Sequence, residues 1–581
     1  MTEAEARLTA FRESAEQRLT LLYGAERAPA VTDQLMGLLN RYQSAIYHHT
    51  RSSDWDETDN LLITYGDAIR NRDEPGLLQL ERFLEAFYPS LISNIHLLPF
   101  YPYSSDDGFS VIDFKQVRDT VGQWDHIDAL ARRFGIMFDL VLNHCSRENL
   151  WFIEYIQNQE PGCNYFIDLD PNTDVSMVTR PRSSPLAAPI NTHRGTRHVW
   201  ATFSEDQIDL NYENPDVLLA MMDIFLFYLS KGARLVRLDA VAFLWKQLGT
   251  SCIHLPETHE IVKLMRDIVD AIAPWVILVT ETNVPHEENL SYFGDCDEAS
   301  MVYQFALPPL VLYTLNRGNA DLLTNWAMTL APPPPHCTYL NFTASHDGIG
   351  LRALEGILPA YEIQSLLDCM HQFGGYVSMK ANPNGKDSPY EINISYFDAL
   401  KGTRTGADQW QVERFLCSQT LMMSLQGIPG FYLQSLIGTP NDLAGVERTG
   451  RLRSINRKTW QWNDLNEVMT DERHPSYIVS QELARRIQLR GEQAAFHPEA
   501  RQRVVDLDSA FFILRRDAED SRVYGIFNVT AVPRTLNLTR LLPSHEAWTY
   551  YDLIGEQQMA SNDELALAPY QVVWLVPVKE D

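Results

Sequence analysis

Charged and polar side chains stand at the ends of several short apolar runs in this chain of 581 residues. The residues at these run ends are Asp139, Asn143, His144, Arg237, Asp239, Glu281, His346 and Asp347. Because side chains alternate along a strand, Arg237 and Asp239 lie on the same face. An isolated buried charge is costly, so these groups are expected to partner one another. Carboxyl, imidazole and guanidinium groups gathered at one rim predict a catalytic pocket.

Each of these residues, taken alone, also has a purely structural explanation. An aspartate at the end of a strand commonly forms a turn or caps a helix. A glutamate there is usually solvated, and Arg237 can serve only to neutralise Asp239. The catalytic interpretation rests on all of these residues occurring together, in order, at the ends of separate apolar runs.

Short apolar runs alternate with amphipathic segments between about residues 60 and 440, which is the pattern of repeated βα units. The runs are residues 61–66, 92–100, 136–144, 233–240, 275–282, 301–307, 338–347 and 427–433. Eight such units predict an α/β fold, a (β/α)8 TIM barrel, whose strand C-terminal ends build the active site. The polar residues described above stand at those ends.

Segments outside this repeat predict additions to the barrel. The gaps after the third and seventh runs are too long for simple loops, and inserted subdomains near the site are expected there. Towards the C-terminus, alternating strands without helices predict an antiparallel β-domain. The expected organisation is a helical extension at 1–58, the barrel at 59–145 and 219–490, an inserted domain at 146–218, a second insertion at 350–405 and the β-domain at 491–581.

The composition excludes several classes of function. Asp and Glu number 76 against 48 Lys and Arg, and a net charge of −28 repels nucleic acid and anionic membranes. The seven dispersed cysteines include no CxxC pair, which disfavours a disulfide framework or a cysteine-rich metal site. The acidic N-terminal segment does not resemble a signal peptide, and the most apolar stretch, 217–229, is too short to span a bilayer. A cytoplasmic protein is expected.

Four segments together resemble the sequence regions of the α-amylase superfamily, glycoside hydrolase family 13. They are DLVLNHCS (139–146), RLDAVAFLW (237–245), VTETN (279–283) and TASHDGIG (343–350). The resemblance, which covers about residues 60–580, implies that Asp239 is the nucleophile, Glu281 the general acid/base and Asp347 the transition-state stabiliser. A retaining mechanism needs one ionised and one protonated carboxyl group about 5–5.5 Å apart. Arg237 is expected to lower the pKa of Asp239 and keep it ionised.

A finer resemblance is to the sucrose phosphorylase group of this family. The segments that show this resemblance are LLPFYPYSSDDGFSVIDF (97–114), VWATFSEDQIDLN (199–211) and RSINR (453–457). The resemblance implies a glucosyl subsite made of Asp106, Phe109, His144, Phe203, Gln207, Arg237, His346 and Arg457. In TRPRSSP (179–185), Arg180 and Arg182 fall where the group has a loop arginine that can meet inorganic phosphate, although two solvated loop arginines are the alternative.

The resemblance also implies that no cofactor or metal is needed. Asn143 matches one usual calcium ligand of α-amylases, but no segment gathers enough oxygen ligands for calcium. The expected partners are a small α-glucoside and inorganic phosphate. A non-catalytic relative is disfavoured, because all three acids are present.

Sucrose phosphorylases have a tyrosine where this chain has Phe243. The segment around Asp239 and the segment ETNVPH (281–286) are similar to another branch of the group. That branch contains phosphorylases of glucosylglycerol, glucosylglycerate and sucrose 6′-phosphate. The loop at 374–391 carries Lys380 and Lys386 but also Asp387 and Glu391, so no clear second anion site is evident.

A neutral acceptor, glycerol, is therefore favoured. The chain is expected to convert 2-O-α-D-glucosylglycerol and phosphate reversibly to α-D-glucose 1-phosphate and glycerol by double displacement. The alternatives are phosphorolysis of glucosylglycerate, sucrose 6′-phosphate or sucrose, or hydrolysis of an α-glucoside by the same fold.

Overall fold

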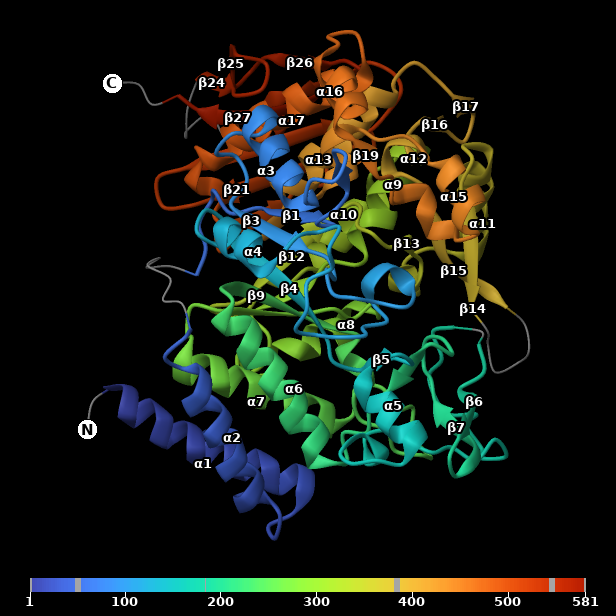
Figure 1. Cartoon of the computed structure of the whole chain (residues 1–581). Coiled ribbons are helices and arrows are strands. Elements are labelled where there is room, and N and C mark those ends of the chain that lie inside the picture. The colour runs from blue at the N-terminus through green and yellow to red at the C-terminus, as the bar shows by residue number, and fades with distance from the viewer. Residues whose placement is uncertain (1–2, 47–53, 183, 381–386, 543–548, 579–581) are drawn as a thin grey trace.

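The computed structural model describes residues 3–46, 54–182, 184–380, 387–542 and 549–578 (Figure 1). Lys386, considered above as an acceptor contact, lies outside these residues.

Eight parallel strands close into a barrel in the order β1-β18-β12-β11-β10-β9-β4-β3. Their bounds are β1 Leu61–Thr64, β3 Asn94–Leu97, β4 Gly135–Val141, β9 Ala233–Asp239, β10 Ile277–Thr280, β11 Met301–Tyr303, β12 Thr338–Phe342 and β18 Ile428–Tyr432. Every residue of these strands is buried, as expected for parallel strands covered on both faces. Each predicted apolar run contains one barrel strand, and the predicted TIM barrel is confirmed.

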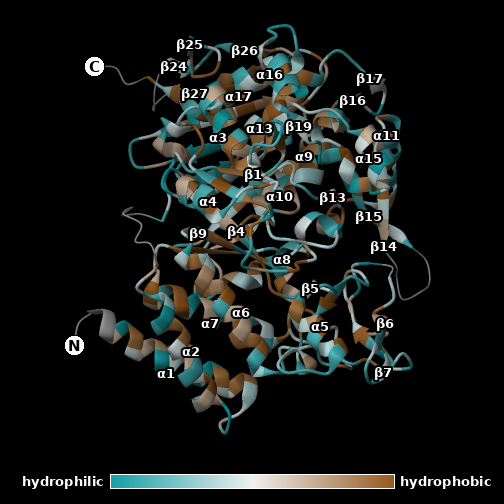
Figure 2. Cartoon of the chain, viewed as in Figure 1, coloured by the Kyte–Doolittle hydropathy of each residue, from teal (hydrophilic) through white to brown (hydrophobic). Residues whose placement is uncertain are grey.

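Helices surround the barrel and carry their apolar faces towards it, so that hydrophobic residues concentrate in the interior (Figure 2). Those following the strands include α3 Gly76–Phe87, α4 Trp124–Ala131, α6 Pro215–Ser230, α7 Pro256–Ile272, α9 Leu307–Arg317, α10 Asp321–Thr329, α13 Gln411–Ser424, α14 Leu433–Ile437, α15 Leu443–Thr449, α16 Trp462–Thr470 and α17 Pro475–Gly491. Helix α6 shows why they begin where they do. The Asn214 side chain accepts from the backbone N–H of Asp216, and Pro215 fills the first helical position.

An N-terminal pair of helices, α1 Glu3–Tyr23 and α2 Ala28–Tyr42, packs on the outside of the barrel against α7 and α6 (Figure 1). Apolar residues such as Leu19 are fully buried in this contact. Arg18 adds ion pairs, with its Nε 2.6 Å from Asp267 Oδ2 and its Nη1 3.1 Å from Glu260 Oε2.

Two insertions extend the barrel after its third and seventh strands. The first contains β5 His144–Ser146, α5 Leu150–Gln157, β6 Ala187–Thr192, β7 Gly195–Trp200 and β8 Gln207–Asp209. The second contains β13 Ile349–Gly350, α11 Ala360–Gln372, β14 Tyr376–Lys380, β15 Ser388–Asn393, α12 Tyr396–Ala399, β16 Gly402–Thr403 and β17 Gly406–Ala407. In the second, β13, β15 and β14 form a small antiparallel sheet.

The C-terminal part is an antiparallel sheet, as predicted, in the order β20-β21-β22-β27-β24-β25. Its strands are β20 Arg501–Val504, β21 Phe511–Asp517, β22 Arg522–Asn528, β24 Thr549–Asp552, β25 Gln557–Ala560 and β27 Val572–Pro577, with β23 Arg534–Asn537 paired to β26 Glu564–Leu567. The buried Trp574 joins this sheet to the barrel, because its Nε1 donates to Ser424 Oγ of α13 at 2.9 Å.

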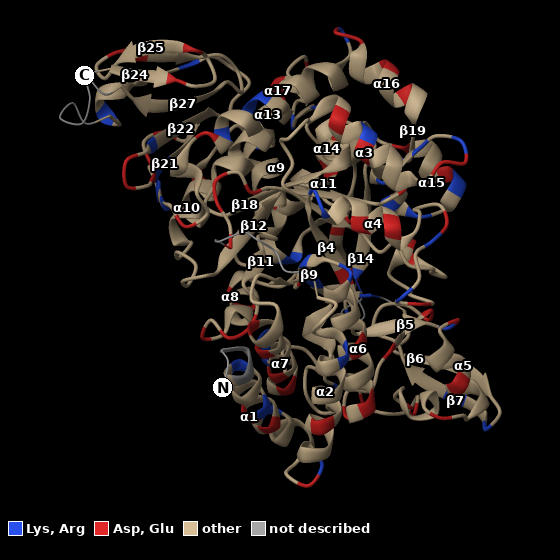
Figure 3. Cartoon of the chain, turned by 60° about the vertical axis from the view of Figure 1, so that its left-hand side comes forward, with Lys and Arg blue, Asp and Glu red and all other residues tan. Residues whose placement is uncertain are grey.

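The excess of acidic residues is carried on outer helices and loops, including α7 and α16 (Figure 3). Across the described ranges, no helix has both the length and the apolar character that a bilayer crossing requires.

Candidate active site

A cavity of about 910 Å³, partly open to solvent, lies among the loops that follow the barrel strands. Except for Arg180 and Arg457, the residues predicted for the site all line it: Asp106, Phe109, His144, Arg182, Phe203, Gln207, Arg237, Asp239, Glu281, His346 and Asp347. The barrel therefore brings together side chains that are up to about 240 positions apart in the sequence.

The inner end of the cavity is organised by the buried Arg237. Its Nη1 lies 2.7 Å from Asp239 Oδ1 and also pairs with Asp139 of the neighbouring strand, while its Nη2 is 3.9 Å from Glu281 Oε2. Asp139 is bonded on its other oxygen by His96 Nε2 at 2.7 Å. Burial opposes the charge of Asp139, but Arg237 and His96 lower its pKa to about 2. Arg237 thus has a permanently ionised carboxylate beneath it.

Asp239 and Glu281 differ in their contacts with this arginine. Burial raises the pKa of Asp239 above its ordinary value, and the direct hydrogen bond and charge of Arg237 act in the opposite direction. Arg237 acts on the pKa of Asp239 in the expected direction, but burial in the free site has the larger effect, so the expected net lowering of this pKa is not found. Burial also raises the pKa of Glu281, and the more distant charge of Arg237, 3.9 Å away, acts in the opposite direction. Among the described residues, its Oε2 accepts one hydrogen bond, from the backbone of Ala240 at 3.2 Å. Because Arg237 donates a hydrogen bond to Asp239 but stays 3.9 Å from Glu281, this arginine favours the carboxylate form of Asp239 more than that of Glu281.

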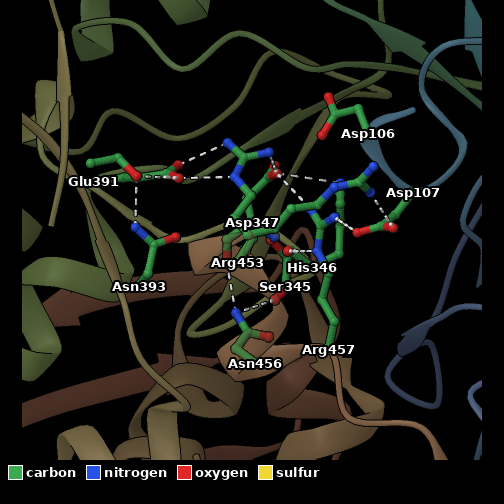
Figure 4. Close-up of polar contacts among 12 residues, drawn as sticks. Asp106, Asp107, Ser345, His346, Asp347, Glu391, Asn393, Arg453, Asn456 and Arg457 are labelled. Carbon is green, nitrogen blue, oxygen red and sulfur yellow. Dashed lines mark hydrogen bonds and ion pairs between the residues drawn. The ribbon is translucent and has the colours of Figure 1, made fainter. Parts of the chain in front are cut away.

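The pKa of Asp347 is lowered, in contrast to the raised pKa values of Asp239 and Glu281. Its Oδ1 lies 2.6 Å from Arg453 Nη1, 3.8 Å from Arg457 Nη2 and 3.5 Å from His346 Nε2 (Figure 4). Burial works against its charge, yet these neighbours, Arg453 first, hold the pKa of Asp347 well below its usual range. Asp347 is a carboxylate at any ordinary pH.

Aromatic and imidazole rings form one wall of the cavity. Phe109 stacks on His346, with ring centroids 4.9 Å apart and planes 8° apart. His144 donates from Nε2 to the carbonyl of Phe109 at 3.0 Å, and burial lowers its pKa, so it is neutral. Phe203 packs against His144 on one side and against Phe243 on the other. A flat, partly apolar wall of this kind suits one face of a sugar ring.

Asp106 lies at a strained turn. It and Asp107 have φ angles of 53° and 49°, a region that side-chain-bearing residues rarely occupy, and such strain concentrates at functional sites. Gln207 Nε2 donates to Asp106 Oδ2 at 3.2 Å, which connects this turn to the first insertion.

The two predicted loop arginines are placed differently. Arg182 lines the cavity, with its guanidinium carbon 5.2 Å from the centre of the Tyr390 ring of the second insertion. Among the described residues, no carboxylate lies within ion-pair distance of Arg182. Arg180 does not line the cavity, and its guanidinium donates to the carbonyl of Ser184.

Arg457 lies behind the cavity wall. Its Nε donates to the carbonyl of His346 at 2.7 Å and its Nη1 to Asp107 Oδ2 at 2.5 Å. It lines a neighbouring hollow, so its contacts hold the wall of the cavity from outside.

Sequence reasoning missed several residues that line the cavity: Asn283, Tyr390, Glu391 and Arg453. Arg453 could have been found from its position four residues before Arg457, in the short 3₁₀ helix Leu452–Asn456 that Arg457 caps. The side chains of the second insertion carry no comparable local signal, because they reach the cavity only through the pairing of β13 with β15.

Asn143, which matches a calcium ligand of α-amylases, has a side-chain cation as its partner. Lys246 Nζ lies 2.7 Å from Asn143 Oδ1 and 2.9 Å from Asp209 Oδ2, and all three residues are buried. In the part of the chain that the structure describes, no cluster of three or more His, Cys, Asp or Glu is arranged to hold a metal ion.

Comparisons with known proteins agree with this geometry. Residues 91–331 match the model of the α-amylase catalytic domain. The glucosylglycerate phosphorylase of Escherichia coli (strain K12) is 46% identical over 93% of this chain and 96% of its own length. The glucosylglycerol phosphorylase of Marinobacter adhaerens is 31% identical over 75% of this chain and 87% of its own length.

A solved relative shows the same fold. The crystal structure of sucrose 6F-phosphate phosphorylase from Thermoanaerobacter thermosaccharolyticum is 25% identical, covers 83% of this chain and 96% of its own, and superposes with a TM-score of 0.71. The chain therefore belongs to the sucrose phosphorylase-like group of the α-amylase superfamily, glycoside hydrolase family 13, and is a glucosyl phosphorylase of that group.

Proposed function

We propose that this enzyme catalyses the reversible phosphorolysis of glucosylglycerate to α-D-glucose 1-phosphate and glycerate. The observation that carries the proposal is the 46% identity, over nearly the whole chain, to a glucosylglycerate phosphorylase, against 31% over three quarters of the chain for a glucosylglycerol phosphorylase. Glycerol, the acceptor favoured by the sequence, is therefore replaced by glycerate.

The cavity offers a physical reason for this change. A neutral acceptor was expected because the sequence of the 374–391 loop offers no clear cation for an acceptor carboxylate. Arg182 is such a cation: it lines the cavity, and its face rests near Tyr390 instead of a carboxylate. An arginine fork matches the two oxygens of a carboxylate or of phosphate. In a double displacement glycerate leaves before phosphate enters, so one guanidinium can serve both anions in turn.

The proposed first step transfers the glucosyl group to the enzyme. Glu281 gives its proton to the glycosidic oxygen, and the bond from that oxygen to the anomeric carbon breaks. A carboxylate oxygen of Asp239 forms a bond to the anomeric carbon on the opposite face. Asp347, held ionised by its arginines, favours the positive charge that develops on the ring. Glycerate leaves as the free alcohol.

The second step regenerates the enzyme. A phosphate oxygen attacks the anomeric carbon, Glu281 takes the proton from the attacking phosphate, and Asp239 departs as a carboxylate. Two inversions return α-glucose 1-phosphate with retained configuration. The cycle starts with Glu281 protonated, which its raised pKa favours, and with Asp239 ionised, which its hydrogen bond from Arg237 favours.

The reverse reaction tests the proposal. The enzyme is incubated with α-D-glucose 1-phosphate and, separately, with glycerate, glycerol, fructose or fructose 6-phosphate, and phosphate release is followed. Glycerate is expected to give the highest kcat/KM. A higher value with glycerol would restore the neutral acceptor, and equal release without any acceptor would make the enzyme a hydrolase of the donor.

A further inference from the structure

Asp347 belongs to a row of alternating charges that begins in the cavity and continues behind its wall (Figure 4). The row contains, in spatial order, Glu391, Arg453, Asp347, Arg457, Asp107 and Arg451. Its middle belongs to the barrel, whereas one end, Glu391, comes from the second insertion. The mechanism above uses Asp347 but assigns no part to Glu391.

Glu391 is tied to Arg453 by a two-pronged ion pair. Arg453 Nε donates to Glu391 Oε1 at 2.9 Å, and Nη2 donates to Oε2 at 2.8 Å. The Glu391 side chain is only 4% exposed. Burial opposes its charge, but Arg453 and then Arg182 lower its pKa, so it is a carboxylate. Parallel hydrogen bonds between a guanidinium and a carboxylate are among the strongest and most directional in proteins.

The backbone also fixes the position of the Glu391 carboxylate. Gly350, three residues after Asp347, pairs with Glu391 in the small sheet of β13 and β15. A Cβ at Gly348 would lie 2.9 Å from Glu391 Cδ, so the side chain runs directly over this glycine. The segment that carries Asp347 and the strand that carries Glu391 are therefore one rigid unit.

Besides Glu391, Arg453 contacts Asp347, and this contact determines which oxygen of Asp347 is left for a ligand. After its two bonds to Glu391, Arg453 approaches Asp347 most closely from Nη1 to Oδ1, at 2.6 Å. The closest approaches of Arg457 and His346 are also to Oδ1. Within the described part of the chain, no hydrogen bond reaches Asp347 Oδ2. One oxygen is thus anchored and the other is available to a sugar hydroxyl.

We propose that Glu391 is a positioning residue for Asp347. It occupies two donors of Arg453 and so limits this arginine to a single contact with the catalytic-site carboxylate. Without the charge of Glu391, Arg453 is free to form the two-pronged pair with Asp347 itself. Both oxygens of Asp347 would then be occupied, and the glucosyl ring would compete with an ion pair for its hydrogen bonds.

The proposal rests on the proposed function only for the role of Asp347 towards the glucosyl ring. Its test can therefore avoid glycerate altogether. α-D-Glucosyl fluoride serves as donor, and transfer to phosphate and to water is measured for the full-length enzyme and for Glu391→Gln. Transfer to phosphate by the unmodified enzyme shows that the phosphorylase chemistry is intact, whichever acceptor proves to be natural.

Glu391→Gln is expected to lower kcat/KM by about 10²-fold, the scale of a misplaced catalytic group. The loss should be equal for water and phosphate, because the glucosyl ring is common to both. A loss confined to phosphate would assign Glu391 to the acceptor instead, and an unchanged kcat/KM would overturn the proposal. Glu355→Gln is the matched control: this exposed carboxylate of the same insertion pairs with Lys380 and is expected to change nothing.

A double-mutant cycle separates positioning from general damage to the fold. If Glu391 acts through Arg453, the variant Glu391→Gln/Arg453→Met should be no less active than Arg453→Met alone. Multiplying losses would contradict the proposal. Should Glu391→Gln fail to fold, as judged by its melting transition, Glu391→Asp keeps the charge. That variant is expected to keep more activity than Glu391→Ala, and equal losses would count against a role for the charge.

Discussion

The two halves of the cavity are held together by different means. In the inner, glucosyl half, Asp139, Arg237 and Asp239 lie on adjacent barrel strands and share buried ion pairs. In the outer, acceptor half, Arg182 and Tyr390 come from separate insertions and meet through one ring contact. Buried charge pairs fix geometry, whereas a single cation–ring contact between two loops permits adjustment. We therefore expect the chemistry common to the group in the inner half, and the choice of acceptor in the outer half.

Removing Asp239, the proposed nucleophile, is the largest expected change, and it should abolish all reactions alike. In Asp239→Ala, transfer to glycerate, phosphate and water should each fall by at least about 10⁴-fold. Arg237 keeps Asp139 as a partner, so the melting temperature should change little. Substantial remaining turnover with any acceptor would show that Asp239 is not the nucleophile.

The next largest expected effect is on the free energy of unfolding, and it concerns the buried contacts between the barrel and the first insertion. In Lys246→Met, the buried carboxylate of Asp209 loses its cation and Asn143 Oδ1 loses its donor. Breaking one partner of a buried pair costs about 3–5 kcal/mol. Chemical denaturation should show a lower free energy of unfolding, and Lys263→Met, which removes a partly exposed ion pair between α7 and Asp297, is the control. Equal stability of the two variants would show that Lys246 does not hold the insertion.

Arg182 tests the outer half directly. Arg182→Met should lower kcat/KM for both glycerate and phosphate by about 10- to 100-fold, the value of a charge-assisted hydrogen bond. Hydrolysis of α-D-glucosyl fluoride should be nearly unchanged, because the inner half is untouched. Arg180→Met is the matched control, since its side chain faces the backbone of the same loop. Loss of phosphate transfer with retained glycerate transfer would mean that the two anions use different cations.

The pH dependence of the reaction reports on the inner half. Burial raises the pKa of Glu281, so this acid keeps its proton to a higher pH than an exposed glutamate. Above that pKa, kcat/KM for a glucoside should fall about tenfold per pH unit, because the general acid is lost. α-D-Glucosyl fluoride needs no protonation of its leaving group, and its glucosylation step should lack this alkaline decline. The same decline with both donors would assign the titration to another group.

Much of the inner half could be predicted from sequence, because its signal is local. Each barrel strand is a short apolar run, and Asp239 and Glu281 follow such runs immediately. Glu391 was not predicted as a site residue, since its partner Arg453 is 62 residues away and Glu391 reaches the cavity only after β15 pairs with β13. Likewise, no periodicity in an irregular loop distinguishes Arg182, which faces the cavity, from Arg180, which does not.

The ring contact between Tyr390 and Arg182 is the weakest contact of the outer half, so its loss should have the smallest effect. Tyr390→Leu removes the ring beside Arg182 and should weaken anion binding by about 1 kcal/mol, or roughly fivefold in KM for phosphate and glycerate. Tyr390→Phe keeps the ring and should behave almost as the unmodified enzyme. Because the inner half does not depend on this ring, kcat for fluoride hydrolysis should be the same in both variants. If Tyr390→Phe were as impaired as Tyr390→Leu, the hydroxyl group and not the ring would be the group that acts on the acceptor, and the outer half would hold its anions by hydrogen bonding from both insertions.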